Sequence, residues 1–354
     1  MAPIRFEARS PGEVRVVDAE SLFAEAQAAY SAKHFADASA LYDRVWREFS
    51  VSALGRAARY NAGLAYEAAN DFAAAKQRYQ LLLGDPAATQ CSTGCRDFID
   101  ARFRLGGALL ELKQFAEAEK HYADLLKHGD LTVGDRLEAI GRHGVACFEL
   151  HRPSEAEKDF RAVLRLYRQS ETLERVESDY FVGLAGFYLG ELARQNYRAL
   201  PLRLPEKQLE KDFEAKAEAL LQAQARYLDA MRLDNAEWAV AAGFRIGKLY
   251  EEFYQDFVTA PVPSKLADED RLIYLEEVRQ RVRVLLEKAV RFHEKNVLMA
   301  ERIGAQNRWA KQSNEQLEKL RQLLVPLQTS PTPIAPAPEP ALPGKRQDEP
   351  HHIL

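Results

Sequence analysis

Small, apolar and aromatic positions recur at fixed offsets along the first half of the chain. In two neighbouring stretches a glycine, an aromatic ring, an alanine and a tyrosine follow one another at identical spacing. These series are Gly63, Phe72, Ala75 and Tyr79, and Gly106, Phe115, Ala118 and Tyr122. Because residues three or four apart share one face of a helix, each series predicts two amphipathic helices in succession. The small residues are expected where the helices cross closely, since a larger side chain would hold them apart.

The series occurs twice more, once on either side of these stretches. The outer copies are Ala26, Phe35, Ala38 and Tyr42, and Gly144, Pro153, Ala156 and Phe160. Successive copies are offset by 37, 43 and 38 residues. The series resembles the tetratricopeptide repeat (TPR), a pair of antiparallel helices of about 34 residues. The resemblance covers residues 19–169. It implies four repeats in an all-α, right-handed superhelical TPR solenoid, whose stacked units share a core and leave a concave inner surface.

Longer amphipathic segments continue through residues 170–325, which we interpret as a C-terminal TPR-like helical region. The expected helices are Asp179–Asn196, Pro205–Asp234, Asn235–Phe257, Leu266–Ile303 and Trp309–Leu324. Residues 1–18 precede the first copy as an N-terminal extension. Residues 326–354 hold eight of the sixteen prolines, which favours an extended, disordered tail.

The second half is also similar to TPR proteins of myxobacterial cell envelopes, of the gliding-motility type. The similarity is carried by Trp238, Arg245–Glu251, Pro261–Pro263, Tyr274 and Ala289. It implies a part of an envelope assembly rather than an enzyme. The start of the chain lacks the basic and apolar segments of an export signal. We therefore expect a periplasmic or cell-envelope location if an upstream signal precedes this sequence, and a cytoplasmic one otherwise.

Charge and motif content argue against several classes of function. The 49 Lys and Arg nearly balance the 53 Asp and Glu, so the net charge of -4 gives no overall attraction for nucleic acid. No apolar run reaches the roughly 18 residues of a membrane-spanning helix. Nucleophile-elbow, phosphate-loop and dinucleotide motifs do not occur either, and adjacent acids such as Glu251 and Glu252 are expected on solvated helix faces. We expect a protein that is not an enzyme and binds neither a cofactor nor nucleic acid.

An alternative from a different class is an enzyme with an unrecognised site between the two halves. Closely spaced glycines and tyrosines would line such a pocket, namely Gly183, Gly186, Gly190, Tyr188 and Tyr197. No set of acid, base and nucleophile accompanies them, so close helix packing is the favoured interpretation.

The cysteines allow two interpretations. Cys91 and Cys95 are close enough in sequence to form a local disulfide, or they are two free thiols. No metal site is expected, because the nearest histidines, His121 and His128, do not have a zinc-binding spacing. Cys147 falls at an apolar position of the fourth copy and is expected in the core.

The first helix of each unit would line the concave groove. The candidate partner-binding residues are Phe23, Gln27, Tyr30, Tyr60, Asn61, Leu64, Phe103, Arg104, Leu110 and Phe148. Large apolar side chains on an open concave face are typical of a binding site. The sequence therefore predicts a scaffold or adaptor that binds a peptide or helix of another protein in this groove.

Other occupants and binding modes remain open at this point. A helix of the same chain, near Pro205 or Trp309, would fill the groove in one alternative. In another, a second copy binds there and the protein is a homo-oligomeric structural component. The carboxylate clamp of chaperone-binding TPR proteins is not expected, since Phe23 and Asp100 stand where that clamp has cations and only Asn61 and Arg104 fit it.

Overall fold

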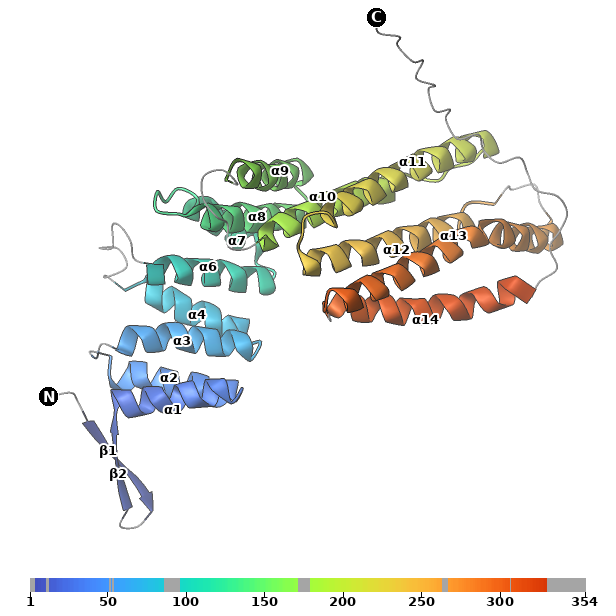
Figure 1. Cartoon of the computed structure of the whole chain (residues 1–354). Helices are drawn as coiled ribbons and strands as arrows, with labels where there is room; N and C mark the ends of the chain where they lie inside the picture. The colour runs from blue at the N-terminus through green and yellow to red at the C-terminus, as the bar shows by residue number, and fades with distance from the viewer. Residues whose placement is uncertain are drawn as a thin grey trace, which may run out of the picture. The chain divides into compact units, whose positions relative to one another are not determined.

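The computed structural model describes residues 4–10, 13–50, 52, 54–85, 96–170, 179–262, 267–305 and 307–329. Over these residues the chain is a succession of helices preceded by one β-hairpin (Figure 1). It divides into two compact units. Unit 1 comprises Met1–Ala199 and Glu218–Gly243, and unit 2 comprises Leu200–Ala217 and Phe244–Leu354.

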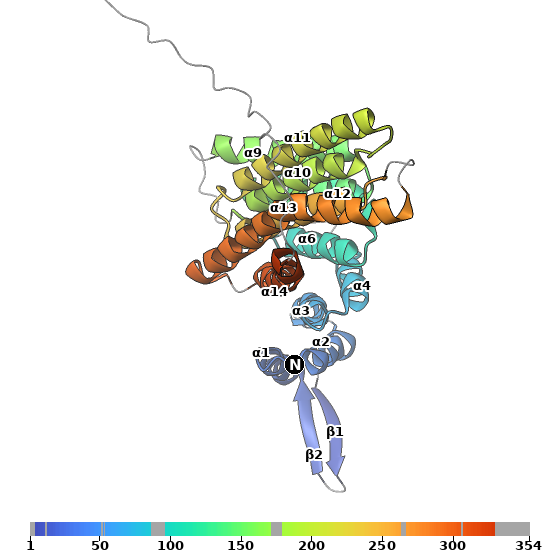
Figure 2. The same cartoon turned by 90° about the vertical axis from the view of Figure 1, so that its right-hand side faces the viewer.

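The N-terminal extension is a β-hairpin that leads directly into the first helix. Strands β1 (Ile4–Ser10) and β2 (Glu13–Asp18) pair antiparallel, with Ile4 opposite Asp18. The Asp18 carboxylate then caps the helix by accepting a 2.7 Å hydrogen bond from the Ser21 amide. Figure 2 shows the hairpin projecting from the end of unit 1 beside α1 and α2.

Four helix pairs follow, as the repeated series predicts. They are α1 (Ala19–Ser31) with α2 (Phe35–Glu48), α3 (Leu54–Ala68) with α4 (Phe72–Leu83), α6 (Arg96–Glu111) with α7 (Phe115–Leu125), and α8 (Val133–Glu149) with α9 (Pro153–Ser170). Each pair is joined by a tight turn that contains one residue with positive φ. These residues are Lys33, Asn70, Lys113 and His151, with φ between 57° and 63°. The shared turn places the two helices of every pair in the same way.

In three of the four pairs a glycine on the first helix lies against an aromatic ring on the second, whereas α1 carries Ala26 at this position. A Cβ atom at Gly63 would lie 2.4 Å from Tyr79, and one at Gly106 would lie 2.4 Å from Tyr122. Both tyrosines are 0% exposed. The sequence prediction that small residues mark the close crossings is therefore confirmed in these two pairs.

A fifth pair of the same kind belongs to unit 1. It combines α10 (Tyr180–Ala199) with the second part of α11 (Glu206–Ala230), and a Cβ at Gly190 would lie 2.4 Å from Tyr227. Gly183 and Gly186 likewise face Trp238 and Leu233 at close range. These glycines of the alternative enzyme site are thus in close packing contact with other side chains.

Unit 2 is built from the first part of α11, the second part of α12 (Ala236–Val258), α13 (Asp268–Arg302) and α14 (Arg308–Thr329). His293 is 0% exposed, and its Nε2 lies 2.9 Å from Glu251 Oε1. The Glu251 side chain is only 13% exposed, and it also contacts Lys248. The prediction of a solvated face is therefore wrong for Glu251.

The predicted helices of the second half agree with the observed ones to within a few residues. At the C-terminus, α14 continues to Thr329, four residues into the predicted tail, and the remainder of the tail lies outside the described residues. Cys91 and Cys95 also lie outside them. Among the helices that are described, none is long and apolar enough to cross a lipid bilayer.

The glycine–tyrosine crossing predicts the effect of one added methyl group. We expect Gly106→Ala to lower the free energy of unfolding by about 1–3 kcal/mol, because the new Cβ overlaps the buried Tyr122 ring. Gly134→Ala is the matched control, since Gly134 is exposed in the first turn of α8 and only Thr132 Oγ1 lies near, at 3.7 Å. The control should keep or raise stability by up to about 1 kcal/mol. Urea denaturation measures both, and equal effects would contradict the packing argument.

Candidate functional site

A cavity of about 470 Å³ opens on the concave surface across the first helices of three successive pairs, α3, α6 and α8. Its lining is rich in charged and aromatic side chains. They include Tyr60, Glu67, Phe72, Arg96, Asp100, Phe103, Arg104, Glu111, Glu138 and Arg142. The cavity therefore lies where the concave groove was predicted.

Ion pairs at this cavity connect the first helix of one helix pair to the first helix of the next. Arg104 Nη1 on α6 lies 3.2 Å from Glu67 Oε2 on α3. Arg96 on α6 donates two hydrogen bonds, of 2.6 and 2.9 Å, to the carboxylate of Asp135 on α8. Paired arginine and carboxylate groups of this kind fix orientation as well as distance. The three groove helices are thus held in register by polar contacts in addition to their apolar core.

Burial raises the pKa of two of the cavity carboxylates, Glu67 and Glu138. It raises the pKa of Glu67 above its ordinary value, although the Arg104 charge acts against this rise. It raises the pKa of Glu138 in the same way, against the charge of Arg142, whose Nε lies 2.9 Å from Glu138 Oε1. The cavity therefore alternates cationic donors with partly desolvated acceptors, which suits a polar ligand.

A second cavity of about 400 Å³ lies beside the first two helix pairs. It is lined by Gln27, Tyr30, Ser31, Tyr42, Asn61 and Leu64. Tyr30 and Gln27 are exposed, and Asn61 is half-buried. This cavity continues the first helices of the concave surface toward the N-terminus.

The predicted groove residues divide into two sets. Seven of the ten line the two cavities, namely Tyr60, Phe103 and Arg104 in the first and Gln27, Tyr30, Asn61 and Leu64 in the second. The other three pack within unit 1. Phe23 meets Tyr42 edge-on at a centroid distance of 5.3 Å, Phe148 meets Tyr188 at 5.2 Å, and Leu110 packs against buried core residues.

The open surface of the groove is more polar than the sequence prediction of apolar anchors. Phe103 lines the first cavity but is only 7% exposed. The ring is covered because it packs in a core cluster with Tyr122 and Leu125 of the following helix. Polar groups such as Glu111 and Arg104 remain open instead.

Several cavity residues were missed from the sequence, although a signal for them exists. Arg96 and Asp100 precede the predicted groove residue Arg104 at spacings of four, so the three form a charged stripe on one face of the helix. Glu138 and Arg142 have the same spacing on α8. A stripe of alternating charge on a first helix therefore marks the groove better than its aromatic residues do.

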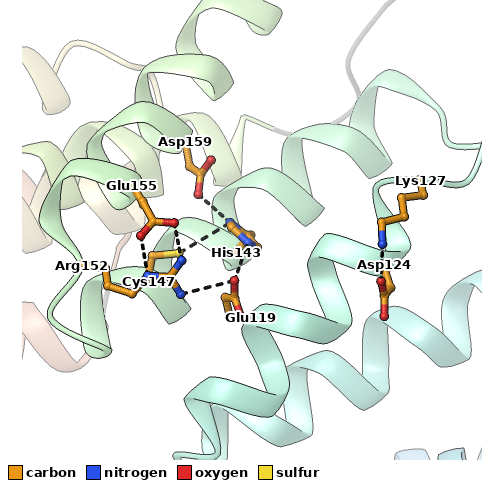
Figure 3. A network of polar contacts seen from close by, with 8 residues as sticks. All are labelled: Glu119, Asp124, Lys127, His143, Cys147, Arg152, Glu155 and Asp159. Atoms are coloured by element: carbon orange, nitrogen blue, oxygen red, sulfur yellow. Dashed lines mark hydrogen bonds and ion pairs between the residues drawn. The ribbon is translucent and has the colours of Figure 1, made fainter.

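A separate polar network joins α7, α8 and α9 (Figure 3). His143 Nδ1 lies 2.6 Å from Asp159 Oδ2, and its Nε2 lies 3.6 Å from Glu119 Oε1. Arg152 Nη1 lies 3.4 Å from the same Glu119 oxygen. The hydrogen bond to Asp159, assisted by the Glu119 charge, raises the pKa of His143 despite the opposing effect of burial. When it is protonated, the imidazole links three helices through two carboxylates.

Glu119, His143 and Cys147 in this network bring potential metal-ligand atoms within 4.8 Å of one another. A metal ion would require the Cys147 thiolate. Burial, however, raises the pKa of Cys147 to about 11, which keeps the thiol protonated at neutral pH. The Arg152 charge also lies against Glu119. We interpret the group as a clamp between helices, and the absence of a metal site stays a prediction.

Comparison with known proteins finds similarity only among solved structures. No protein-family model and no curated protein sequence matches the chain. A tetratricopeptide repeat protein from Parabacteroides merdae is 15% identical over 86% of this chain and 98% of that one, with a TM-score of 0.39. The apo form of RapI is 11% identical over 86% and 97%, with a TM-score of 0.47. A Rap protein complexed with competence and sporulation factor is 11% identical over 87% and 76%, with a TM-score of 0.42. The helix pairs themselves establish an all-α solenoid.

The clamp around His143 predicts a pH dependence of stability. The pKa of His143 is raised in the folded state above the ordinary value of 6.5. Its stabilising effect is therefore complete below pH about 6.5 and is lost as the pH rises through the folded-state pKa. We expect the difference in unfolding free energy between wild type and His143→Gln to shrink between pH about 5.5 and about 9.

His121, on α7 of the preceding helix pair, supplies a control of opposite sign. Burial lowers its pKa, and its Nε2 lies 2.8 Å from the Arg102 carbonyl oxygen. The difference between wild type and His121→Gln should therefore grow over the same pH range. Chemical denaturation at several pH values measures both series, and a gap for His143→Gln that does not change with pH would exclude the charged clamp.

Proposed function

We propose that this protein is a non-catalytic interaction scaffold that binds a segment of another protein in the concave groove of unit 1. The observation that carries the proposal is the 470 Å³ cavity across α3, α6 and α8, with its alternating cationic and anionic side chains. Clefts of a few hundred Å³ with a few well-placed polar groups are typical of binding sites.

The chemistry of the groove favours an extended polar segment over an apolar helix. A helix would need a row of exposed apolar side chains to pack against. The groove instead presents the half-exposed Arg104 and the exposed Glu111, while Phe103 is buried. Charged and amide groups of this type bond well to peptide carbonyls, amides and side chains. Asn61, in the neighbouring cavity, would extend the contact toward the N-terminus.

The ion pairs between neighbouring helix pairs support binding by holding the groove in one geometry. The pairs Arg104 with Glu67 and Arg96 with Asp135 connect adjacent first helices. Side chains that are already ordered lose less entropy when a ligand arrives. A preorganised polar groove therefore gains affinity without a large apolar area.

The composition of the lining supports a non-catalytic role. No Ser, Thr, Cys, His or Lys occurs among the residues that line this cavity. The half-buried acid Glu138 is engaged by the neighbouring Arg142. This set offers recognition rather than the paired nucleophile and base of covalent catalysis. A place within a bacterial envelope or motility complex stays a prediction from the sequence resemblance.

The test is capture of partners from native lysate by the full chain and by the variant Asn61→Ala/Glu111→Lys. Both positions line the concave cavities, and Glu111 is exposed. We expect the captured amount of a set of proteins to fall by about tenfold or more with this variant, because a few hot-spot contacts supply most of the binding energy of an interface. Quantitative mass spectrometry provides the measurement, and a peptide from the identified protein should then bind wild type directly in calorimetry.

The matched control is Gln80→Ala/Glu210→Lys, which makes the same changes at exposed positions outside both cavities. It should capture the same proteins as wild type. Identical capture by the groove variant would contradict the proposal. Recovery of the chain alone, with a dimer that the groove variant dissociates, would replace it with the homo-oligomeric alternative.

A further inference from the structure

A third cavity, of about 590 Å³, lies among α9, α10 and the second part of α11, all within unit 1. It shares no lining residue with the concave groove. Its walls carry Arg161, Arg165, Arg168 and Arg226, and its single acidic lining residue is Asp229. A strongly basic surface therefore exists on a chain whose formal net charge is -4.

The arginines are arranged for simultaneous contact with one ligand. Arg161, Arg165 and Arg168 follow one another at spacings of four and three residues, so they share a face of α9 over about 10 Å. Arg226 is contributed by α11. All four side chains belong to exposed residues.

Most of this positive charge is not neutralised within the chain. Arg161 pairs with Glu157, and the acidic Asp229 is itself paired with Arg232 at 3.0 Å. In the part of the chain that the structure describes, no ion pair engages Arg165, Arg168 or Arg226. Three guanidinium groups are therefore open to an anionic partner.

The floor between the arginines is apolar. It is made by Leu164 of α9, Leu189 of α10, and Ala230 and Leu233 at and just beyond the end of α11. Gly186 completes it, and a Cβ there would lie 2.5 Å from Leu233 Cδ1. The leucines are half-buried, so part of each remains open to a ligand.

We propose that this basic groove binds an acidic amphipathic segment of a partner protein. Glutamate or aspartate side chains of the segment pair with Arg165, Arg168 and Arg226, and its apolar side chains cover Leu164, Leu189 and Leu233. The planar guanidinium matches a carboxylate with two parallel hydrogen bonds. Helix-spaced acids on the partner match the spacing of the arginines on α9.

The apolar floor distinguishes this partner from other anions. A free phosphate or a nucleic-acid backbone would form ion pairs with the arginines but leave the leucines exposed to water. Single-stranded nucleic acid is normally held by aromatic side chains on which its bases stack, and the lining of this groove contains no aromatic residue. Charge and apolar surface side by side fit an acidic peptide that carries both kinds of group.

The experiment uses fluorescence anisotropy with the full chain and a labelled helical peptide of about 16 residues, which carries glutamates on one face and leucines beside them. We expect binding that weakens as salt is added. The variant Arg165→Gln/Arg226→Gln should weaken binding by about tenfold or more. Lys120→Gln/Lys207→Gln removes the same charge at exposed positions outside the groove and should change affinity by less than about twofold.

Peptide variants and a competitor separate the explanations. Replacing either the glutamates by glutamine or the leucines by alanine should weaken binding by about tenfold or more. Equal binding of the alanine peptide would reduce the groove to general anion attraction and overturn the proposal. The proposal would also be overturned if the peptide did not bind wild type, or if the control variant lost as much affinity as the groove variant. Displacement of the peptide by a tighter-binding single-stranded RNA would overturn it too. The concave-groove variant Asn61→Ala/Glu111→Lys should keep full affinity, so failure of this inference is distinguishable from failure of the proposed function.

Discussion

The contact between a glycine on one helix and a buried aromatic ring on the next sets the geometry of unit 1. It recurs at Gly63 with Tyr79, Gly106 with Tyr122 and Gly190 with Tyr227, each at 2.4 Å from the position of an added Cβ. Because both partners are buried, the helices can approach closely only in one relative rotation. That rotation decides which side chains of each first helix face the core and which remain on the concave surface.

The concave and basic grooves follow from this arrangement but differ in how they treat charge. In the concave cavity, arginines form ion pairs with acids of the neighbouring helix pair, as Arg104 does with Glu67. Between α9 and α11 the arginines have few acids to pair with and surround leucines. One surface is therefore ordered by its own ion pairs before a ligand arrives, whereas the other leaves its charge to be satisfied by a ligand.

The sequence was sufficient to predict the helix pairs. In the structure the second helix of each pair begins at a recurring position of the repeated series, namely Phe35, Phe72, Phe115 or Pro153. Periodicity determines which face of a helix is buried, and the aromatic residues Tyr79 and Phe160 of the repeated series are both 0% exposed. Periodicity does not determine how far a side chain is covered by the following helix. Phe103 was therefore expected to be more exposed than it is. The basic groove was missed because its arginines come from α9 and α11, which are far apart in sequence.

Two helices of the solenoid are shared between the units. Unit 1 takes Glu218–Gly243 from the end of α11 and the start of α12, while unit 2 takes the residues before and after this segment. Successive segments of the chain therefore belong alternately to unit 1 and unit 2. A fragment that stops at Ala199 would strip Tyr227 from Gly190 and Trp238 from Gly183, and would expose the α10 face that they cover. No single cut in the chain therefore separates unit 1 from unit 2.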